Sequence, residues 1–386
     1  MLYTRRELGK LALAALPAAA LLPKELQAAA RLQGKPNSKW AGVQVGMNMP
    51  YNLGTDAANH WYGNFTNGDE IIARCVQLGC SAVELRMQPV ELFLESPEVV
   101  AAAATAATNA ANRGRGAGGR QGGRGAAAAD AAAPATAPAP AAAAGEPAAP
   151  APARGGGRAA QTPEQQAAQK AAAEATRKWR LSVPMSKVRE FRKKFNDAGV
   201  LIDIVKVDGI FGFSEEEIDY AFQLAQNLGA RGLSTEISTV AQEADRLAAF
   251  KKVGQFADKH KMLIGYHGHT ATGPKQWQEA FSQAKYNGAN LDIGHYVGGN
   301  KTSPIPFLKE QHERITHIHV KDKTLQDVNV SFGQGDTPIK EALQAIRDNK
   351  WNIQATIEFE YPVPAGSDRM AEMAKCMEFC KAALLG

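Results

Sequence analysis

Short apolar segments alternate with amphipathic segments over most of the chain. The apolar segments have the length of buried strands, and the amphipathic segments repeat their apolar residues at the spacing of a helix. The predicted strands are 43–48, 82–87, 201–207, 232–237, 263–267, 290–294, 315–320 and 354–360. The predicted helices are 69–79, 187–198, 214–228, 242–260, 274–285, 304–313, 336–349 and 367–384. Strands and helices that alternate in this way and end on a helix predict a single (β/α)8 TIM barrel, with a doubly wound open sheet as the competing α/β arrangement.

One region interrupts this alternation after the second predicted strand. Residues 101–176 consist largely of Ala, Gly, Pro, Arg and Gln, with few large apolar side chains. Such a segment cannot bury enough apolar surface to offset its ordering entropy, so we expect a disordered insertion that leaves the barrel on its catalytic rim. Within it, 163–178 has a composition suited to a helix. A tether, a partner-binding arm and neutral expansion are its alternative roles, and we favour the last. The segments 41–100 and 177–386 together match the usual barrel size of about 250 residues.

Residues 1–30 have the pattern of an export signal. Arg5 and Arg6 precede an Ala/Leu-rich run at 11–22, and small residues at 28–30 offer a cleavage site. This resembles a twin-arginine signal peptide, which implies export of a folded protein to the periplasm. An amphipathic N-terminal helix is the alternative, and an uncleaved leader would act as a membrane anchor. No later apolar run is long enough to span a bilayer.

The formal net charge of +5 does not indicate a nucleic-acid-binding surface. Many of the positive charges lie in the leader or in the low-complexity region: Arg5, Arg6, Lys10, Arg113, Arg115, Arg120, Arg124, Arg154 and Arg158. Without them the barrel segments are near neutrality, so we expect no basic groove for a phosphate backbone.

The cysteines lack the spacing of a metal or redox motif. Cys75 and Cys80 flank the end of one predicted helix, and Cys376 and Cys380 lie one turn apart on the last. We expect all of them to be buried as small apolar side chains. A disulfide between the first and last helices, which are neighbours in a closed barrel, is the alternative.

Carboxylates and imidazoles recur where the predicted strands end. They are Glu236 in "GLSTE", His267 and His269 in "IGYHGH", Asp292 and His295 in "LDIGH", His317, His319, Lys321 and Asp322 in "HIHVKD", and Glu358 and Glu360 in "IEFE". Their spacing is about one βα unit, so the side chains should converge at the C-terminal mouth of the barrel, where active sites of this fold are built. A mixed set of carboxylates and imidazoles suits one divalent ion: Mn²⁺, Mg²⁺ or Co²⁺, with Zn²⁺ as the alternative.

This series of strand ends resembles the sugar phosphate isomerase/epimerase superfamily, the xylose-isomerase-like barrels, over most of 41–384 apart from the insertion. "LDIGH" followed by "HIHVKD" is the most specific part of the likeness. The resemblance implies a substrate-contacting role for His295. His267 stands at a position that varies among branches, and Glu360 lies on the same predicted strand face as Glu358. The metal ligands that the resemblance implies are Glu236, Asp292, His319 and Glu358.

The expected chemistry is proton transfer next to a carbonyl. A divalent ion that holds a sugar carbonyl and the adjacent hydroxyl makes the C–H between them more acidic and stabilises the enediolate. Glu236 and Glu358, from opposite sides of the barrel, are the carboxylates expected to remove and return the proton. His295, His269 and Lys321 are expected to polarise the oxygen that gains charge.

Three outcomes share that first step. Return of the proton to the other face gives epimerisation, return to the neighbouring carbon gives aldose–ketose isomerisation, and loss of a β-hydroxyl gives dehydration. We therefore predict a metal-dependent sugar isomerase or epimerase. A keto-sugar or inosose dehydratase and a non-catalytic exported sugar-binding barrel are the alternatives.

Further residues are candidates for contact with the carbohydrate. They include His267, His269 and His295, together with Trp61 in the aromatic loop after the first strand and Glu84 in the second strand. The alternative role of the loop is packing over the rim, and that of Glu84 is a buried structural carboxylate paired with Arg86 or a lysine. The apurinic endonuclease branch is not supported, because the strand ends "VELRM" and "VKVDG" lack the histidines that its three zinc ions need.

Overall fold

The computed structural model describes residues 35–54, 67–103 and 162–386. The chain divides into a barrel unit, residues 1–106 and 175–386, and a second unit, residues 107–174. The predicted leader and residues 104–161 of the predicted insertion therefore lie outside the described residues. Helix α7 (Pro163–Ser182) crosses the boundary between the two units.

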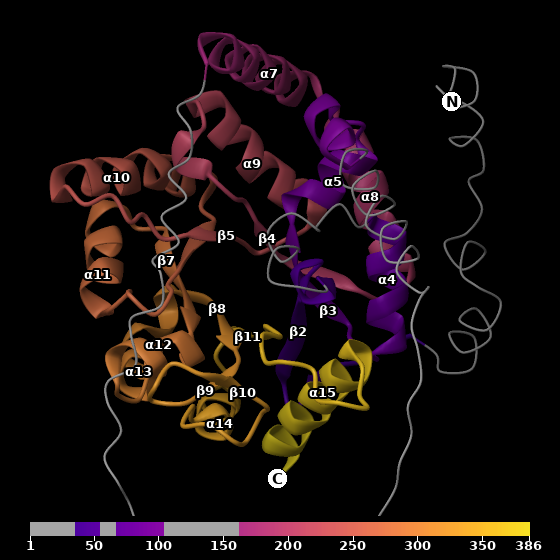
Figure 1. Ribbon diagram of the computed structural model, residues 1–386, viewed down its shortest axis with the longest axis vertical. Coiled ribbons are helices and arrows are strands. Elements are labelled where there is room, and N and C mark those ends of the chain that lie inside the picture. Colours follow the sequence, from indigo (N-terminus) through magenta and orange to yellow (C-terminus); the bar gives the residue numbers. More distant parts are fainter. Residues whose placement is uncertain (1–34, 55–66, 104–161) are drawn as a thin grey trace, which may run out of the picture. The chain divides into compact units, whose positions relative to one another are not determined.

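A closed ring of parallel strands lies at the centre of the barrel unit (Figure 1). The strands are β2 (Val43–Met49), β3 (Ala82–Arg86), β4 (Leu201–Lys206), β5 (Gly232–Glu236), β6 (Leu263–His267), β7 (Asn287–Asp292), β8 (Ile315–Val320) and β11 (Gln354–Ile357). Each pairs in parallel with the next, and β2 closes the ring by pairing with both β3 and β11. This confirms the predicted (β/α)8 barrel, and the open sheet was the wrong alternative.

Helices surround the strands (Figure 1). Besides α7 they are α4 (Gly68–Gln77), α5 (Met87–Phe93), α8 (Met185–Asp197), α9 (Glu215–Leu228), α10 (Glu243–His260), α11 (Pro274–Gln283), α12 (Ile293–Asn300), α13 (Ile305–Gln311), α14 (Ile339–Asn349) and α15 (Arg369–Leu385). The strand residues are mostly buried, as expected of a parallel sheet covered on its outer face by helices.

Several short elements decorate this frame. Strand β1 (Lys39–Trp40) pairs antiparallel with β2, and β9 (Asp322–Lys323) forms a small hairpin with β10 (Asn329–Val330). Single 3-10 turns occupy η2 (Tyr51–Leu53), η3 (Ile210–Gly212) and η4 (His312–Arg314). The sequence pattern predicted none of these elements, because each is too short to show a periodicity.

Two strands end two or more residues earlier than predicted. Strand β7 stops at Asp292, because the Asp292 carboxylate accepts a hydrogen bond from the backbone N–H of His295 and so caps α12. Strand β11 stops at Ile357, so Glu358 and Glu360 do not share a strand face as expected. The Glu358 N–H still donates to Val320 O, at 3.1 Å, which holds this residue beside the end of β8.

The strand register places the predicted site residues at one level of the barrel. Asp292 pairs with His319 across β7 and β8, and Glu236 pairs with His267 across β5 and β6. Since β5 and β11 are separated by three strands on either side of the ring, their carboxylates approach from opposite walls.

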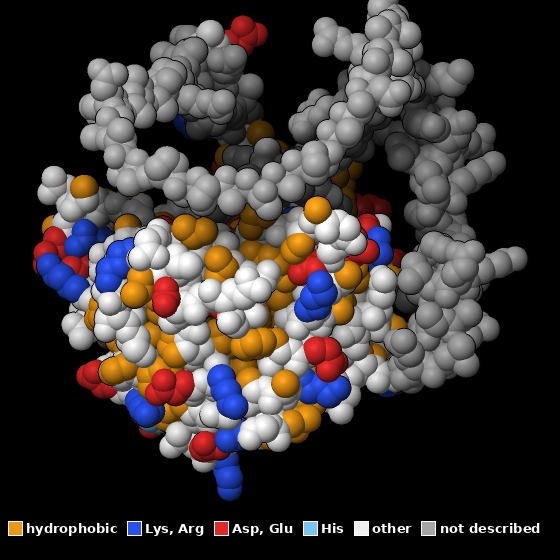
Figure 2. Space-filling model, turned by 60° about the horizontal axis from the view of Figure 1, so that its bottom comes forward, with side chains coloured by type: hydrophobic (Ala, Val, Ile, Leu, Met, Phe, Trp, Pro, Cys, Tyr) orange, Lys and Arg blue, Asp and Glu red, His pale blue; other side chains and the backbone are white. Residues whose placement is uncertain are grey.

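The cysteines are buried and free, so the disulfide alternative was wrong. In the three described ranges, no helix combines the length and apolarity that crossing a membrane requires. The face of the molecule in Figure 2 carries acidic and basic side chains interspersed with apolar ones, without an expanse of one sign on that face.

Candidate active site

Four side chains meet at the C-terminal mouth of the barrel. We call His267, Asp292, His319 and Glu358 the central cluster; one ligand atom from each lies within 4.8 Å of the others. They come from the ends of β6 and β7, from β8 and from the residue after β11. All four are buried, with at most 3% of any residue exposed. Buried carboxylates and imidazoles at such spacing need either a cation or one another as partners.

Glu84, on β3, orients one imidazole of the central cluster. His319 Nε2 donates to Glu84 Oε2 at 2.6 Å, and Ser234 donates to the other carboxylate oxygen at 2.6 Å. This leaves Nδ1 of His319 facing Glu358 Oε2 at 3.2 Å. A carboxylate that fixes the far nitrogen of an imidazole is the usual support of a metal-binding histidine.

The residues of the central cluster fit a divalent ion. His319 Nδ1 is buried and makes no hydrogen bond of regular geometry within the part of the chain that the structure describes. Buried polar atoms of this kind are rare in proteins unless a ligand completes them. Two imidazole nitrogens with two carboxylates form a donor set suited to Mn²⁺, Co²⁺ or Zn²⁺.

Lys321 reaches the same carboxylates from the segment between β8 and β9. Its Nζ lies 2.5 Å from Glu358 Oε2, 3.1 Å from Asp292 Oδ2 and 2.7 Å from Glu360 Oε2. Gly294 allows this approach, because a side chain at that position would collide with the Lys321 stem. Burial lowers the pKa of Lys321, but the three carboxylates outweigh it and raise that pKa well above its ordinary value.

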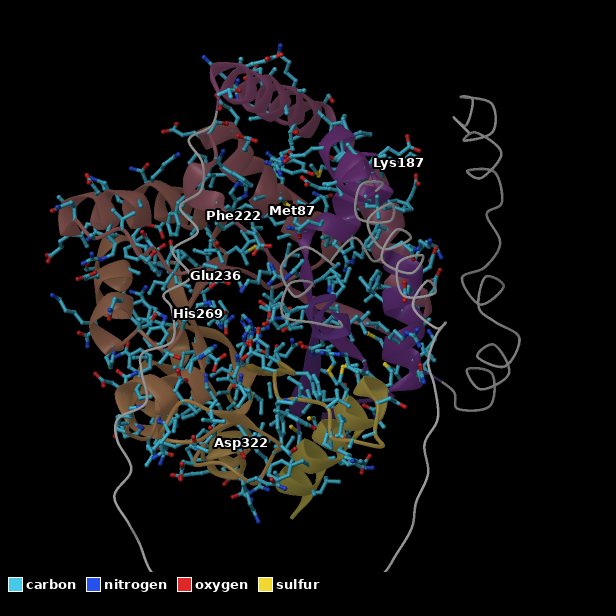
Figure 3. All side chains as sticks on the ribbon, viewed as in Figure 1. Met87, Lys187, Phe222, Glu236, His269 and Asp322 are labelled. Atoms are coloured by element: carbon cyan, nitrogen blue, oxygen red, sulfur yellow. The ribbon has the colours of Figure 1, made fainter. Side chains whose placement is uncertain are left out.

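A second group adjoins His267 on the β5 side of the mouth. Glu236 lies 2.6 Å from Lys206 Nζ, 3.1 Å from His267 Nδ1 and 2.7 Å from His269 Nε2. Figure 3 shows Glu236 and His269 next to each other. Burial raises the pKa of Glu236, but Lys206 and His267 outweigh it and lower that pKa well below its ordinary value. The Glu236 side chain is 28% exposed, so it is an ionised carboxylate open to a substrate.

A third group adjoins Glu358 on the opposite side. Glu360 Oε1 accepts from the Tyr51 hydroxyl at 2.6 Å, and the His295 Nε2 lies 3.0 Å from Lys321 Nζ. Burial, and next the charge of Lys321, lowers the pKa of His295 to about 3. His295 is therefore neutral at physiological pH and offers a hydrogen bond without a charge.

The structure brings three of the predicted ligands together: Asp292, His319 and Glu358 lie in the central cluster with His267. Glu236 lies with His267 and His269 in a neighbouring group that could also hold an ion, so its predicted ligand role stays a prediction. Glu84 lies beneath His319 with no exposed surface and is not paired with Arg86, whose ion-pair partner is Asp208. Trp61 lies outside the described residues, so its predicted contact with the substrate stays a prediction.

Lys206 is a buried cation at the mouth that sequence reasoning missed. It is the last residue of β4, is 1% exposed, and pairs in register with Arg86 on β3 and Ser234 on β5. A lysine in an apolar strand that ends at the catalytic face was the available signal, since such a residue is buried only with a charged partner.

A (β/α)8 barrel with a buried carboxylate–imidazole cluster at its C-terminal mouth defines a class of barrels whose cluster is consistent with a metal site. Residues 181–383 match the model of the xylose isomerase-like TIM barrel family, and the chain belongs to that family.

Curated relatives and solved structures share parts of the chain. An inosose dehydratase of Clostridium botulinum (strain Eklund 17B / Type B) is 36% identical over 76 residues, 18% of this chain and 25% of that protein. An inosose dehydratase of Clostridium tetani is 25% identical over 147 residues, 32% of this chain and 49% of that protein. The chain thus spans at most about half the length of these curated relatives. A sugar phosphate isomerase/epimerase structure from Parabacteroides distasonis is 14% identical, with a TM-score of 0.42 over 52% of this chain and 77% of that one.

Proposed function

We propose that this barrel is a divalent-metal-dependent enzyme that removes a proton next to a carbonyl of a carbohydrate and returns it, as a sugar isomerase or epimerase does. The observation that carries the proposal is the central cluster of His267, Asp292, His319 and Glu358 with the more exposed Glu236 beside it. Family membership supports a small sugar as the substrate.

The central cluster would hold one divalent ion. Bound there, the ion supplies positive charge to a carbonyl oxygen and its neighbouring hydroxyl, which makes the C–H between them more acidic. The buried Glu84 keeps Nδ1 of His319 available as a ligand, and Asn48 donates to the second oxygen of Glu358 at 2.8 Å.

The protein's own groups would move the proton. Glu236 is ionised and reachable, so it is the proposed base on the β5 side. Glu358, on the opposite wall, is the predicted partner that returns the proton on the other face of the sugar. The ammonium of Lys321, which donates to Nε2 of the neutral His295 at 3.0 Å, would polarise the substrate oxygen that gains charge, and His295 would orient it.

Dehydration is the second candidate, and the names of the curated relatives favour it. Each of the three curated relatives that match is named inosose dehydratase, with 25% to 36% identity over parts of the chain. Both reactions begin with the same proton removal, and a dehydratase then expels a β-hydroxyl as water. His269, 47% exposed and bonded to Glu236, is the proposed acid that would protonate such a leaving group.

The test is elemental analysis of the purified protein followed by exchange of substrate C–H for deuterium in heavy water. The parent should hold about one equivalent of Mn, Co, Zn or Mg and should exchange a keto-sugar or keto-cyclitol proton. His319→Ala should lose the metal. Glu236→Gln should keep the metal and exchange at least about a hundredfold more slowly, as expected when a general base is removed.

The outcomes separate the candidates. Exchange without loss of water supports the isomerase or epimerase, and formation of an unsaturated or deoxygenated product supports the dehydratase. A parent without metal, even after reconstitution, contradicts both reactions and leaves the non-catalytic sugar-binding barrel.

We also propose export through the twin-arginine route, on the strength of Arg5 and Arg6 and the run at 11–22. A double Arg→Lys variant at these two positions should leave the precursor inside the cell. Equal periplasmic yields of parent and variant would contradict the proposal.

A further inference from the structure

Each basic side chain at the mouth that the structure describes already has an acidic partner. Lys206 pairs with Glu236 at 2.6 Å, Lys323 with Asp327 at 2.5 Å, and Arg86 with Asp208. Lys321 contacts three carboxylates. The acidic residues of the mouth outnumber these four bases: Glu84, Asp208, Glu236, Asp292, Asp327, Glu358 and Glu360. An acidic substrate would therefore have to compete with a carboxylate for each of these four cations.

Several amide side chains at the mouth present unpaired acceptors. Asn48 donates to Glu358 at 2.8 Å, Gln88 donates to Asp208 at 3.1 Å, and Asn329 donates to Glu360 at 3.4 Å. Because a carboxylate can only accept, each contact fixes the NH2 group toward the acid and turns the carbonyl oxygen away from it.

Those carbonyl oxygens have no donor. The Oδ1 of Asn48, Oε1 of Gln88 and Oδ1 of Asn329 are buried and lack a hydrogen-bond partner among the described residues, as does Oδ1 of Asp208. A buried acceptor without a donor destabilises a protein, because its lost hydration is not replaced. Several of them around one mouth indicate a site built to receive donors from a ligand.

We infer that the substrate is an uncharged polyhydroxyl compound, a sugar or cyclitol without phosphate or carboxylate. Its hydroxyl groups donate to the unpaired oxygens of Asn48, Gln88, Asn329 and Asp208. A phosphate group carries a charge of about −1.5 to −2 at neutral pH and offers mainly acceptors, whereas these four oxygens need donors and each of the four cations already faces a carboxylate. This inference rests on the proposed function for its site and extends it to a substrate class.

The first test compares matched probes on the full-length, metal-loaded protein. D-fructose and myo-inositol are titrated against D-fructose 6-phosphate and inorganic phosphate, with thermal unfolding and calorimetry as readouts. Stabilisation by the neutral compounds but not by the phosphates supports the inference. Tighter binding of the phosphates, or no response to the neutral compounds, overturns it.

Deuterium exchange separates this inference from the proposed function. If neutral compounds bind but neither neutral nor phosphorylated keto compounds exchange a C–H for deuterium, the proposed reaction fails and the inferred substrate class stands. If only phosphorylated ketoses exchange, the reaction stands and the substrate class fails.

A single variant tests the acceptor argument. In Asp208→Asn the amide oxygen would face Arg86, and its NH2 would replace the unpaired oxygen, so an acceptor becomes a donor. Binding of the neutral probe should weaken about tenfold, the worth of one charge-assisted hydrogen bond. Asp219→Asn on α9 is the matched control, since that carboxylate pairs with Lys259 at 2.7 Å on the outer surface. Equal affinities in the two folded variants would overturn the role of Asp208.

Discussion

Glu84 accepts a hydrogen bond from Nε2 of His319 at 2.6 Å, although 235 residues separate them in the sequence. Both side chains are fully buried, and the contact directs the other imidazole nitrogen toward Glu358. Burial raises the pKa of Glu84, but His319 and His317 outweigh it and hold that pKa well below its ordinary value. Glu84 is therefore an ionised support for a ligand, not a ligand that a substrate could touch.

Replacement of Glu84 by Gln should weaken metal binding by about ten- to a hundredfold, the usual effect of losing a carboxylate behind a metal-binding imidazole. The measurement is competitive titration of the metal-free protein with a chelating dye. Glu279→Gln, which removes the carboxylate partner of Arg246 between α10 and α11, away from the mouth, is the matched control and should leave metal affinity unchanged. Equal affinity in Glu84→Gln and the parent would contradict the supporting role.

Metal affinity should rise with pH. Burial lowers the pKa of His319, but Glu358 and Glu84 outweigh it and raise that pKa well above its ordinary value of about 6.5. In the metal-free protein this imidazole is protonated at neutral pH, so an incoming ion must displace its proton. Affinity should therefore fall up to about tenfold for each pH unit below the raised pKa, with release of about one proton per ion.

Calorimetry in two buffers of different ionisation enthalpy measures that proton release. The stability of the metal-free protein should instead fall as the pH rises. The pKa of His319 is higher in the folded than in the unfolded protein, so protonation of this imidazole stabilises the fold. That contribution is complete below the unfolded pKa, about 6.5, and is lost as the pH rises through the folded pKa. Metal binding without proton release would show that His319 is neutral before the ion arrives.

The sequence predicted the barrel and the convergence of its polar strand ends, but not which of them share one ion. Strand-end spacing is enough to bring Asp292, His319 and Glu358 to the same mouth, since parallel strands end on one face. Whether Glu236 or His267 lies with these three depends on the directions of the side chains. Glu236 is turned toward Lys206, and the burial of that lysine is evident only when β3, β4 and β5 lie side by side.

The limits of the strands, too, were predictable from the sequence only in part. Strand β7 was predicted to start at residue 290 because the preceding residues Asn287, Gly288 and Ala289 form no apolar run. Backbone pairing with β6 nevertheless begins at Asn287. Backbone hydrogen bonds do not require apolar side chains, so periodicity alone misses this start.

Arg180 should be a strong stabilising residue where α7 joins the barrel. It donates to Glu91 at 2.8 Å and to Glu217 at 2.9 Å and lies over the Phe213 ring at 4.5 Å. Arg180→Ala leaves the 2% exposed Glu91 without its guanidinium partner and should lower the free energy of unfolding by about 3–5 kcal/mol. Chemical denaturation measures the change.

Lys187→Ala is the control for that variant. Its partner Glu190 is 3.0 Å away, and both side chains are more than half exposed, so the loss should stay below about 1 kcal/mol. Similar losses in the two variants would mean that the buried pairs of Arg180 contribute no more than a surface ion pair.

The second unit should be removable without loss of the barrel. The two chain segments that lead into it are joined to each other, because the Thr176 hydroxyl donates to Glu98 at 2.7 Å and Thr176 is 3% exposed. Replacement of residues 107–174 by about eight Gly and Ser residues should leave metal content unchanged and should raise the free energy of unfolding by up to about 2 kcal/mol, since a shorter loop costs less entropy to close. Chemical denaturation with elemental analysis tests this. A loss of stability above about 3 kcal/mol would instead mean that residues 107–174 contribute to the fold of the barrel, and neutral expansion would be the wrong origin for them.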